Sequence, residues 1–366
     1  MRRATHNSES ARALLLVLAV AAAHGALAAV APPAEPAASA SPAVAPEQWL
    51  ERMNQALTTR NYDGTFAHWH GGTVQMLRII HRLQDGKVAE RLVSLDGSGR
   101  EFIRSGQLLS CYLPDKRTVL VEKRPPEQSL VSFPAVSPET ANYYDIQELA
   151  RTRLNRRDTH LITIAPRDEF RYGYRLWIDD ATAMPLKTQL CDSGGHVIEQ
   201  IVFANLALPA HIADSAFKPD VATDGFRWLR NDVAAGAPPA LPASVWSSLK
   251  LPRGFRMLVQ GSQTLPGSSV PATHVVFTDG LASVSVFVEQ REPPANGTHS
   301  TQAESTCIGS SCAFSFTSDG RKVTAVGEVP PATVRFIATQ VRAGSAAPGD
   351  ASAVACVPPG CPRPPQ

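Results

Sequence analysis

Long apolar runs and an excess of charge are both missing from most of this 366-residue chain. After residue 28 no apolar run reaches the roughly 20 residues that a transmembrane helix needs. The 35 basic and 33 acidic residues are interspersed and leave a net charge of +2. Because nucleic-acid binding needs a clustered basic surface, we expect no nucleic-acid partner.

A recognisable catalytic constellation is also missing. Gly97–Gly99 (GSG) lacks the spacing of a nucleophile elbow and fits a glycine-rich turn better. The adjacent carboxylates at Asp168-Glu169 and at Asp179-Asp180 fall in predicted turns beside charged neighbours, and neither forms a convincing acid–base pair. We therefore predict a binding protein with no enzyme activity and no cofactor.

Two small groups of residues leave alternatives open. His68 and His70 share one face of a predicted strand, as two metal ligands would, but no third ligand is evident in the sequence. We interpret them as an exposed strand end and predict no metal site. The arginines of Arg151–Arg157 either meet a phosphate or an acidic partner, or form an ordinary solvated face, which is the usual role of such a run.

The N-terminus has the pattern of a secretory leader. Arg2 and Arg3 precede the short apolar stretch Ala13–Val20, and Ala26–Ala28 fits a signal-peptidase site. We expect residues 1–28 to be removed, with a retained membrane anchor as the alternative. Residues 29–45 are nearly all Ala, Pro and Ser and are predicted to be a disordered spacer.

Export agrees with the use of cysteine. In an oxidising compartment six cysteines can pair in many ways, which the sequence does not resolve. Two pairs are spaced five positions apart with no histidine in the loops between them, which favours disulfides over zinc. The six are Cys111, Cys191, Cys307, Cys312, Cys356 and Cys361.

Composition divides the rest of the chain into two domains. An Ala/Pro-rich linker at residues 231–244 separates a first domain, 46–230, from a smaller second domain, 245–343, and a Pro-rich tail covers 344–366. The fold class that we predict is α+β with mostly antiparallel β-structure.

The first domain is predicted to begin with a helix at Pro46, whose apolar stripe faces the core. An antiparallel meander then follows, interrupted by a helix or helix-like loop at Asp145–Arg157. Apolar residues on both faces of the early strands indicate a curved, half-closed barrel that holds either a packed core or an apolar cavity. The predicted strands are 65–70, 73–82, 87–95, 101–105, 108–113, 172–178, 185–191 and 199–206.

The second domain is predicted to be a compact α+β module of four strands and one helix. Asp279-Gly280 gives the strongest hairpin pattern in the chain, and Asp319-Gly320 gives a second one. The helix follows Pro330-Pro331, with Val334, Ile337, Ala338 and Val341 on one face. The predicted strands are 272–278, 281–289, 313–317 and 321–329.

Several segments together resemble the MucB/RseB family of periplasmic regulators of the envelope-stress sigma factor (sigma-E/AlgU). In chain order they are NYDGTFAHWHGG, MLRIIHR, AERLVSLDGSGREFIR, YRLWIDDATAMPLKTQL, TDGLASVSVFVE and VTAVGEVPPATVRFIA. The resemblance runs from about Pro46 to Arg342. It departs in the spacer, in the linker, in the loop Cys307–Cys312 and in the tail, so no disulfide pairing is carried over.

The resemblance implies a periplasmic protein without enzyme activity. Its first domain would be a LolA/LolB-like unclosed β-barrel that wraps helices and senses lipid, and its second would be a small α+β partner-binding domain. Family members bind the periplasmic part of an RseA/MucA-type anti-sigma factor and shield it from proteolysis, and lipid or lipopolysaccharide releases that hold. The resemblance places the partner surface on the second domain and the linker, and a homo-oligomer stays open.

Two other functions compete with this one. A lipid or lipoprotein carrier is suggested by the barrel alone, although a simple carrier has no need of the second domain. A periplasmic hydrolase would need a nucleophile with a base in reach. For the regulator we predict that large apolar side chains on one concave face hold an acyl chain. This set is Trp69, Met76, Ile80, Leu92, Phe102, Tyr172, Tyr174, Leu176 and Ile178.

Overall fold

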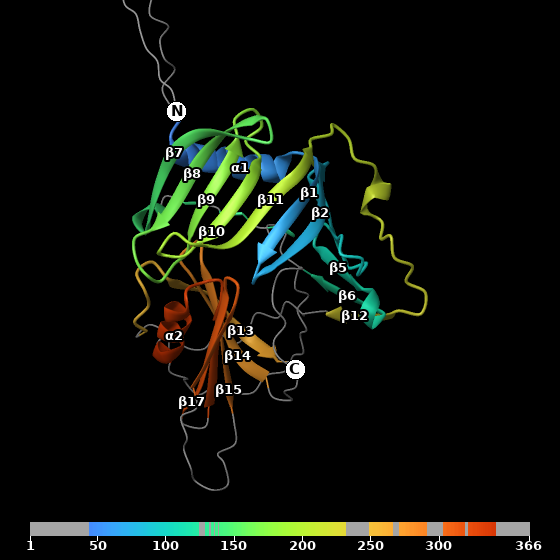
Figure 1. The fold of residues 1–366 in the computed structure, drawn as a ribbon. Helices are drawn as coiled ribbons and strands as arrows, with labels where there is room; N and C mark the ends of the chain where they lie inside the picture. The colour runs from blue at the N-terminus through green and yellow to red at the C-terminus, as the bar shows by residue number, and fades with distance from the viewer. Residues whose placement is uncertain are drawn as a thin grey trace, which may run out of the picture. The chain divides into compact units, whose positions relative to one another are not determined.

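The computed structural model describes most of the two predicted domains (Figure 1). The predicted signal peptide and tail, and nearly all of the predicted spacer and linker, lie outside the described residues, as does Asp319-Gly320. Within the described part no helix is both long and apolar enough to cross a membrane. The described residues are 44–123, 129–131, 133–134, 136–137, 139–231, 249–265, 271–290, 303–318 and 321–341.

The first element is α1, Pro46–Thr59, which begins at the proline as predicted. Proline suits the first helical turn because its backbone needs no hydrogen-bond donor there. Trp49, Met53 and Ala56 are buried, and the half-buried Leu57 packs against the same core. The predicted stripe therefore does face the core.

Twelve strands form one sheet. They are β1 (Tyr62–His70), β2 (Thr73–Gln84), β3 (Lys87–Ser94), β4 (Glu101–Ser105), β5 (Leu108–Leu113), β6 (Thr118–Lys123), β7 (Tyr144–Leu154), β8 (Arg157–Pro166), β9 (Gly173–Asp179), β10 (Pro185–Cys191), β11 (Val197–Ala207) and β12 (Arg227–Asn231).

Their spatial order is β12-β6-β5-β4-β3-β2-β1-β11-β10-β9-β8-β7. Neighbouring strands are antiparallel, except that β12 runs parallel to β6. The end strands β12 and β7 do not pair with each other, so the sheet is unclosed. This confirms the predicted mostly antiparallel, unclosed architecture, with β6, β8 and β12 as strands that the sequence analysis did not predict.

The predicted helix or loop at Asp145–Arg157 is wrong, because these residues form β7 and the turn after it. The pairing register shifts between Glu148 and Ala150, which marks a β-bulge. A bulge interrupts the alternation of faces, so the apolar positions take on helix-like spacing. Asn155 and Arg156, both with positive φ, then connect β7 to β8 as a two-residue hairpin turn.

The second sheet has six strands rather than the four predicted. Its order is β13-β14-β15-β18-β17-β16, and α2, Pro331–Gln340, packs against β17 and β18. The predicted helix face and the hairpin at Asp279-Gly280 are confirmed. The strands are β13 (Arg256–Thr264), β14 (Pro271–Thr278), β15 (Ser283–Gln290), β16 (Ala303–Ile308), β17 (Ser311–Ser318) and β18 (Arg321–Gly327).

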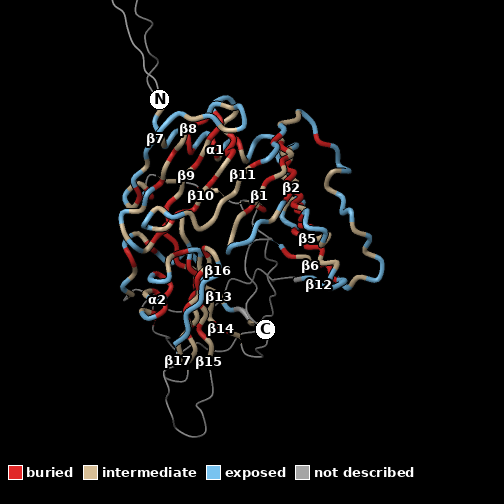
Figure 2. The backbone as a smooth tube through the Cα atoms, viewed as in Figure 1, coloured by how far each residue is buried: buried red, intermediate tan, exposed pale blue. Residues whose placement is uncertain are grey.

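Apolar side chains of α1 and of one face of the large sheet make the core of the first domain. Met53 and Leu176 belong to one part of this core, and Ala56, Phe66 and Leu77 belong to another. We call the α1-facing side of the sheet the inner face. Figure 1 shows α1 running across it behind β8 to β11, and Figure 2 shows buried and exposed backbone interleaved along these strands.

The cysteines agree with the expected oxidising chemistry. Cys307 and Cys312 form a disulfide across the β16–β17 hairpin, and Cys111 is disulfide-bonded as well. Cys191 is a free, buried thiol, and its burial raises its pKa. Cys356 and Cys361 lie outside the described residues.

Removing the α1 contact should destabilise the protein. Met53 is completely buried, so Met53→Ala should lower the free energy of unfolding by about 2–5 kcal/mol through lost contacts and a residual cavity. Met76, 37% exposed on β2, gives the matched control, and Met76→Ala should change it by less than about 0.5 kcal/mol. Urea unfolding measures both, and equal effects would contradict the assignment of α1 to the core.

Candidate binding site on the inner face

The alternation of β1 decides which residues reach the inner face. Tyr62, Phe66 and His68 are buried on this face. The cross-strand register then places Leu77 opposite Phe66, and on the neighbouring strands it places Phe102 opposite Leu92. Leu92 and Phe102 therefore belong to the inner core, as the predicted acyl-binding set requires.

Four further members of that set are buried or half-buried. Leu176 and Ile178 are fully buried against α1, and Tyr174 packs beside them. Tyr172 precedes β9 and is buried, with its hydroxyl 3.9 Å from the sulfur of Cys312. Their role in ligand binding stays a prediction.

The remaining three members, Trp69, Met76 and Ile80, lie on the opposite face. Trp69 alternates with His68 and His70 along β1, and the β1–β2 register places Met76 and Ile80 on its side of the sheet. The expectation that all nine side chains share one concave face is therefore wrong. Since β2 carries apolar residues on both faces, its sequence does not reveal which face is inner.

A hollow of about 250 Å³ lies on the inner face, where the ends of β9, β10 and β11 meet the second domain. Its wall is mostly apolar, but the hydroxyl oxygen of Thr188 is buried there with no hydrogen-bond partner in the part of the chain that the structure describes. Two carboxyl groups, Glu199 and Glu328, also line it. The wall consists of Phe133, Pro134, Tyr174, Thr188, Leu190, Glu199, Gln200, Ile201, Gly280, Leu281 and Glu328.

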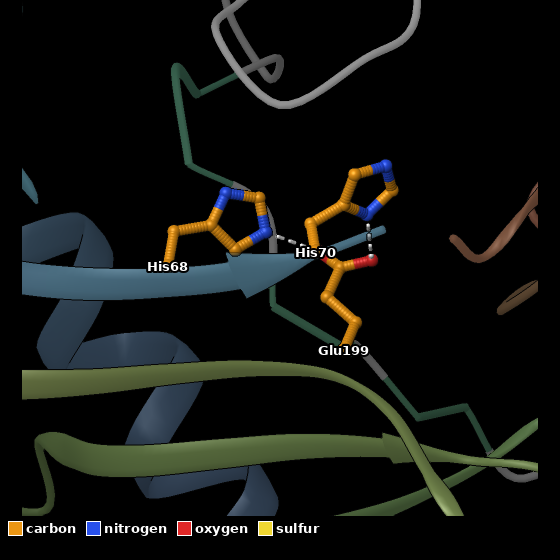
Figure 3. Close-up of side chains that lie close together, drawn as sticks. All are labelled: His68, His70 and Glu199. Atoms are coloured by element: carbon orange, nitrogen blue, oxygen red, sulfur yellow. Dashed lines mark hydrogen bonds and ion pairs between the residues drawn. The ribbon is translucent and has the colours of Figure 1, made fainter. Parts of the chain in front are cut away.

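Beside this hollow, two imidazoles converge on one carboxylate (Figure 3). The Nε2 atom of His68 lies 2.7 Å from Oε1 of Glu199, and the Nδ1 atom of His70 lies 3.2 Å from Oε2. Only 9% and 11% of the two histidine side chains are exposed. The interpretation of these histidines as an exposed strand end is therefore wrong.

The two domains meet at this cluster. Ser310, at the tip of the β16–β17 hairpin, donates a 2.7 Å hydrogen bond to Oε2 of Glu199. Burial alone would raise the pKa of Glu199, but the hydrogen bonds from His68 and Ser310 outweigh it and lower the pKa. Burial and the charge of Glu199 raise the pKa of Glu328. Two neighbouring carboxyl groups thus have opposite tendencies to hold a proton.

A second polar contact between the domains is fully buried. Arg171 and Asp279 have no exposed side-chain surface, and Nε of Arg171 lies 2.6 Å from Oδ2 of Asp279. The hydroxyl of Tyr144 donates to the same oxygen, and the rings of Tyr143, Tyr144 and Phe255 lie 5.0–5.6 Å from the guanidinium carbon. The other oxygen of Asp279 accepts from two backbone amides of the β14–β15 turn.

The sequence identified only part of this site. His68 and His70 were singled out, but Glu199 lies 129 positions after His70 and was not recognised as their partner. Arg171 and Asp279, 108 positions apart, were likewise not paired. For Arg151–Arg157 the structure supports the solvated face, because Arg151, Arg153 and Arg156 are exposed.

Two family models match the sequence of this chain, one in each domain. The model of the MucB/RseB N-terminal domain matches residues 45–221, and that of the MucB/RseB C-terminal domain matches residues 240–342. The sigma factor AlgU regulatory protein MucB of Pseudomonas aeruginosa is 29% identical over 316 residues, which are 84% of this chain and 94% of that protein. The sigma-E factor regulatory protein RseB of Escherichia coli K12 is 27% identical over 322 residues, with the same coverage.

Solved structures give the same result. The Pseudomonas aeruginosa MucA/MucB complex contains a chain that matches with a TM-score of 0.62 and 26% identity, over 82% of this chain and 99% of that one. A crystal structure of MucB in complex with MucA(peri) matches with a TM-score of 0.61 and 27% identity, again over 82% and 99%. Both domains are therefore similar to proteins of known fold.

Breaking the buried ion pair should be costly. Asp279→Ala removes the fully buried partner of Arg171, which keeps only Asp168, a partly exposed carboxylate, as its counter-charge among the described residues, and should lower the free energy of unfolding by about 3 kcal/mol. Asp145 pairs with Arg167 at the surface, each about half exposed, so Asp145→Ala should cost less than about 1 kcal/mol. Urea unfolding compares the two variants. Equal losses in the free energy of unfolding would show that the buried pair stabilises the protein no more than the surface pair does.

Proposed function

Because this chain belongs to the MucB/RseB family, we propose that it is a periplasmic regulator that binds the periplasmic segment of a MucA/RseA-type membrane anti-sigma factor. In this complex the anti-sigma factor is shielded from regulated proteolysis, and the envelope-stress sigma factor stays inhibited. The observation that carries the proposal is the similarity, over 82% of the chain, to MucB solved together with MucA.

An edge of the second sheet supports a place for this partner. Among the described residues β13 pairs only with β14, so its other edge offers backbone groups that no described strand pairs. Met257, Leu258 and Val259 on this strand are 41%, 63% and 50% exposed. An apolar strand edge favours the addition of an extended segment from another chain. The partner surface in our proposal is this edge, within the second domain.

The hollow supports a place for a lipid signal. Its volume of about 250 Å³ is below the roughly 300–1,000 Å³ of sites that enclose a drug-sized ligand. An acyl chain therefore has to widen the hollow as it enters. Leu281 and Gly280 form part of the wall, next to Asp279, so widening acts directly on the turn that Arg171 holds.

A ligand of this kind controls the partner through linkage. If the widened state binds the anti-sigma segment poorly, the lipid lowers the apparent affinity for that segment by the same factor by which the segment lowers the affinity for lipid. A lipid or lipoprotein carrier is the alternative function. The second domain favours the regulator, since a simple carrier has no need of it.

The first test is a binding measurement by calorimetry. The purified mature protein should bind the periplasmic segment of the anti-sigma factor encoded beside it, and a lipid A-type amphiphile should weaken this binding. The physical reason is the competition between the widened and the partner-binding states. A stoichiometric lipid complex without any binding of the segment would favour the carrier instead.

The partner surface has its own test. Leu258→Glu places a charge on the apolar edge of β13 and should weaken binding of the anti-sigma segment at least about tenfold, which corresponds to about 1.4 kcal/mol. Leu108→Glu, at a leucine of β5 that is 47% exposed, is the matched control and should leave the affinity unchanged. Equal affinities for Leu258→Glu and the wild type would exclude this edge as the binding surface.

A further inference from the structure

The His68–His70–Glu199 cluster has the composition of a metal site that the sequence alone did not reveal. One nitrogen of each histidine and one carboxylate oxygen all lie within 4.8 Å of one another. Neutral imidazole and carboxylate are the donors that zinc takes from proteins when cysteine is not used. Figure 3 shows the three side chains pointing toward one another from β1 and the neighbouring β11.

The donor atoms need only small movements to reach the spacing of a tetrahedral ion's ligands. With metal–ligand bonds of about 2.0–2.1 Å, tetrahedral zinc holds its ligand atoms about 3.3 Å apart. The contacts of Glu199 with His68 and His70, at 2.7 and 3.2 Å, are made through its two different oxygens, and the three donor atoms of the cluster lie within 4.8 Å of one another. Because both histidines lie on one strand, side-chain rotations alone adjust the three donors.

We propose that His68, His70 and Glu199 bind one Zn²⁺ ion on the inner face, with an open fourth position toward the hollow that Glu199 and Glu328 line. Three protein ligands and one exchangeable position are the usual arrangement of zinc sites that are not purely structural. The cation also supplies positive charge beside the largely buried Glu199. This inference does not depend on the proposed regulatory function.

The second domain provides the outer shell of this site. Ser310 donates its hydrogen bond to Glu199 and thereby orients the carboxylate, as outer-shell groups orient metal ligands. Gly309 lies against the ring of His70, where an added Cβ would be 2.4 Å from a ring carbon. The disulfide between Cys307 and Cys312 closes the hairpin that carries both residues.

One nitrogen of the histidine cluster has no hydrogen-bond partner among the described residues. It is the Nε2 atom of His70, which is buried. An unpaired buried nitrogen costs free energy. Because Nδ1 is the nitrogen that faces Glu199, an ion satisfies Nε2 only if the ring of His70 turns to present that atom.

The test measures zinc uptake by the full mature chain. The protein, free of affinity tags, is stripped with a chelator and its accessible thiols are alkylated, so that no free cysteine contributes a ligand. Titration with Zn²⁺ against a competing chromogenic chelator should give one ion per chain. Co²⁺ should give the visible absorption of a four-coordinate site with nitrogen and oxygen ligands.

Variants locate the ion. His70→Gln and Glu199→Gln should each weaken binding by more than about 100-fold, because loss of an outer-shell group alone costs about 10–100-fold. Ser310→Ala should give a loss within that smaller range. His196→Gln is the matched control, since His196 is 81% exposed and pairs only with Asp192 among the described residues; it should bind zinc like the wild type.

The same variants separate a metal ligand from a purely structural role. Zn²⁺ should raise the melting temperature of the wild type and of His196→Gln, but not that of Glu199→Gln, which keeps the shape of the side chain but replaces one accepting oxygen with an NH2 donor. The proposal is overturned if the stripped wild type takes up no zinc. It is also overturned if His70→Gln and Glu199→Gln bind zinc as tightly as the wild type does, because the ion then lies elsewhere.

Discussion

The buried ion pair between Arg171 and Asp279 is the constraint on which the arrangement of this protein depends. Each partner comes from a different domain, and neither charge is accessible to water. Removing two charges from water is expensive and is offset only by close, well-oriented contacts. The aromatic rings and Tyr144 provide these contacts around Arg171. The β14–β15 turn, and the part of the hollow that it forms, are therefore held in position by this pair together with Tyr144.

Glu199 connects the two other parts of the site. It lines the hollow, it joins both histidines, and it accepts a hydrogen bond from the second domain through Ser310. A displacement of Glu199 in the hollow therefore changes its contacts with both histidines and with Ser310 of the β16–β17 hairpin. The lipid and the cation that we propose would therefore both act at this carboxylate.

Local patterns predicted the elements that local chemistry determines. The helix at Pro46 and the hairpin at Asp279-Gly280 follow from turn and capping residues and were found correctly. β7 was missed because its bulge imitates helical spacing. The site was found only in part, because Glu199 reaches His70 through a strand pairing that spans more than a hundred residues. Short-range patterns hold no information about such a partner.

The pairing of β1 with β11 has a consequence for how the chain folds. β2 to β6 join their predecessors through short connections, and so do β8 to β11, but only the β1–β11 contact joins these two halves at the centre of the sheet. Contacts between residues so distant in sequence form slowly. Until residues 197–207 have joined the sheet, β1 is an open edge with unpaired backbone groups. During this interval the folding chain is most exposed to aggregation through this edge.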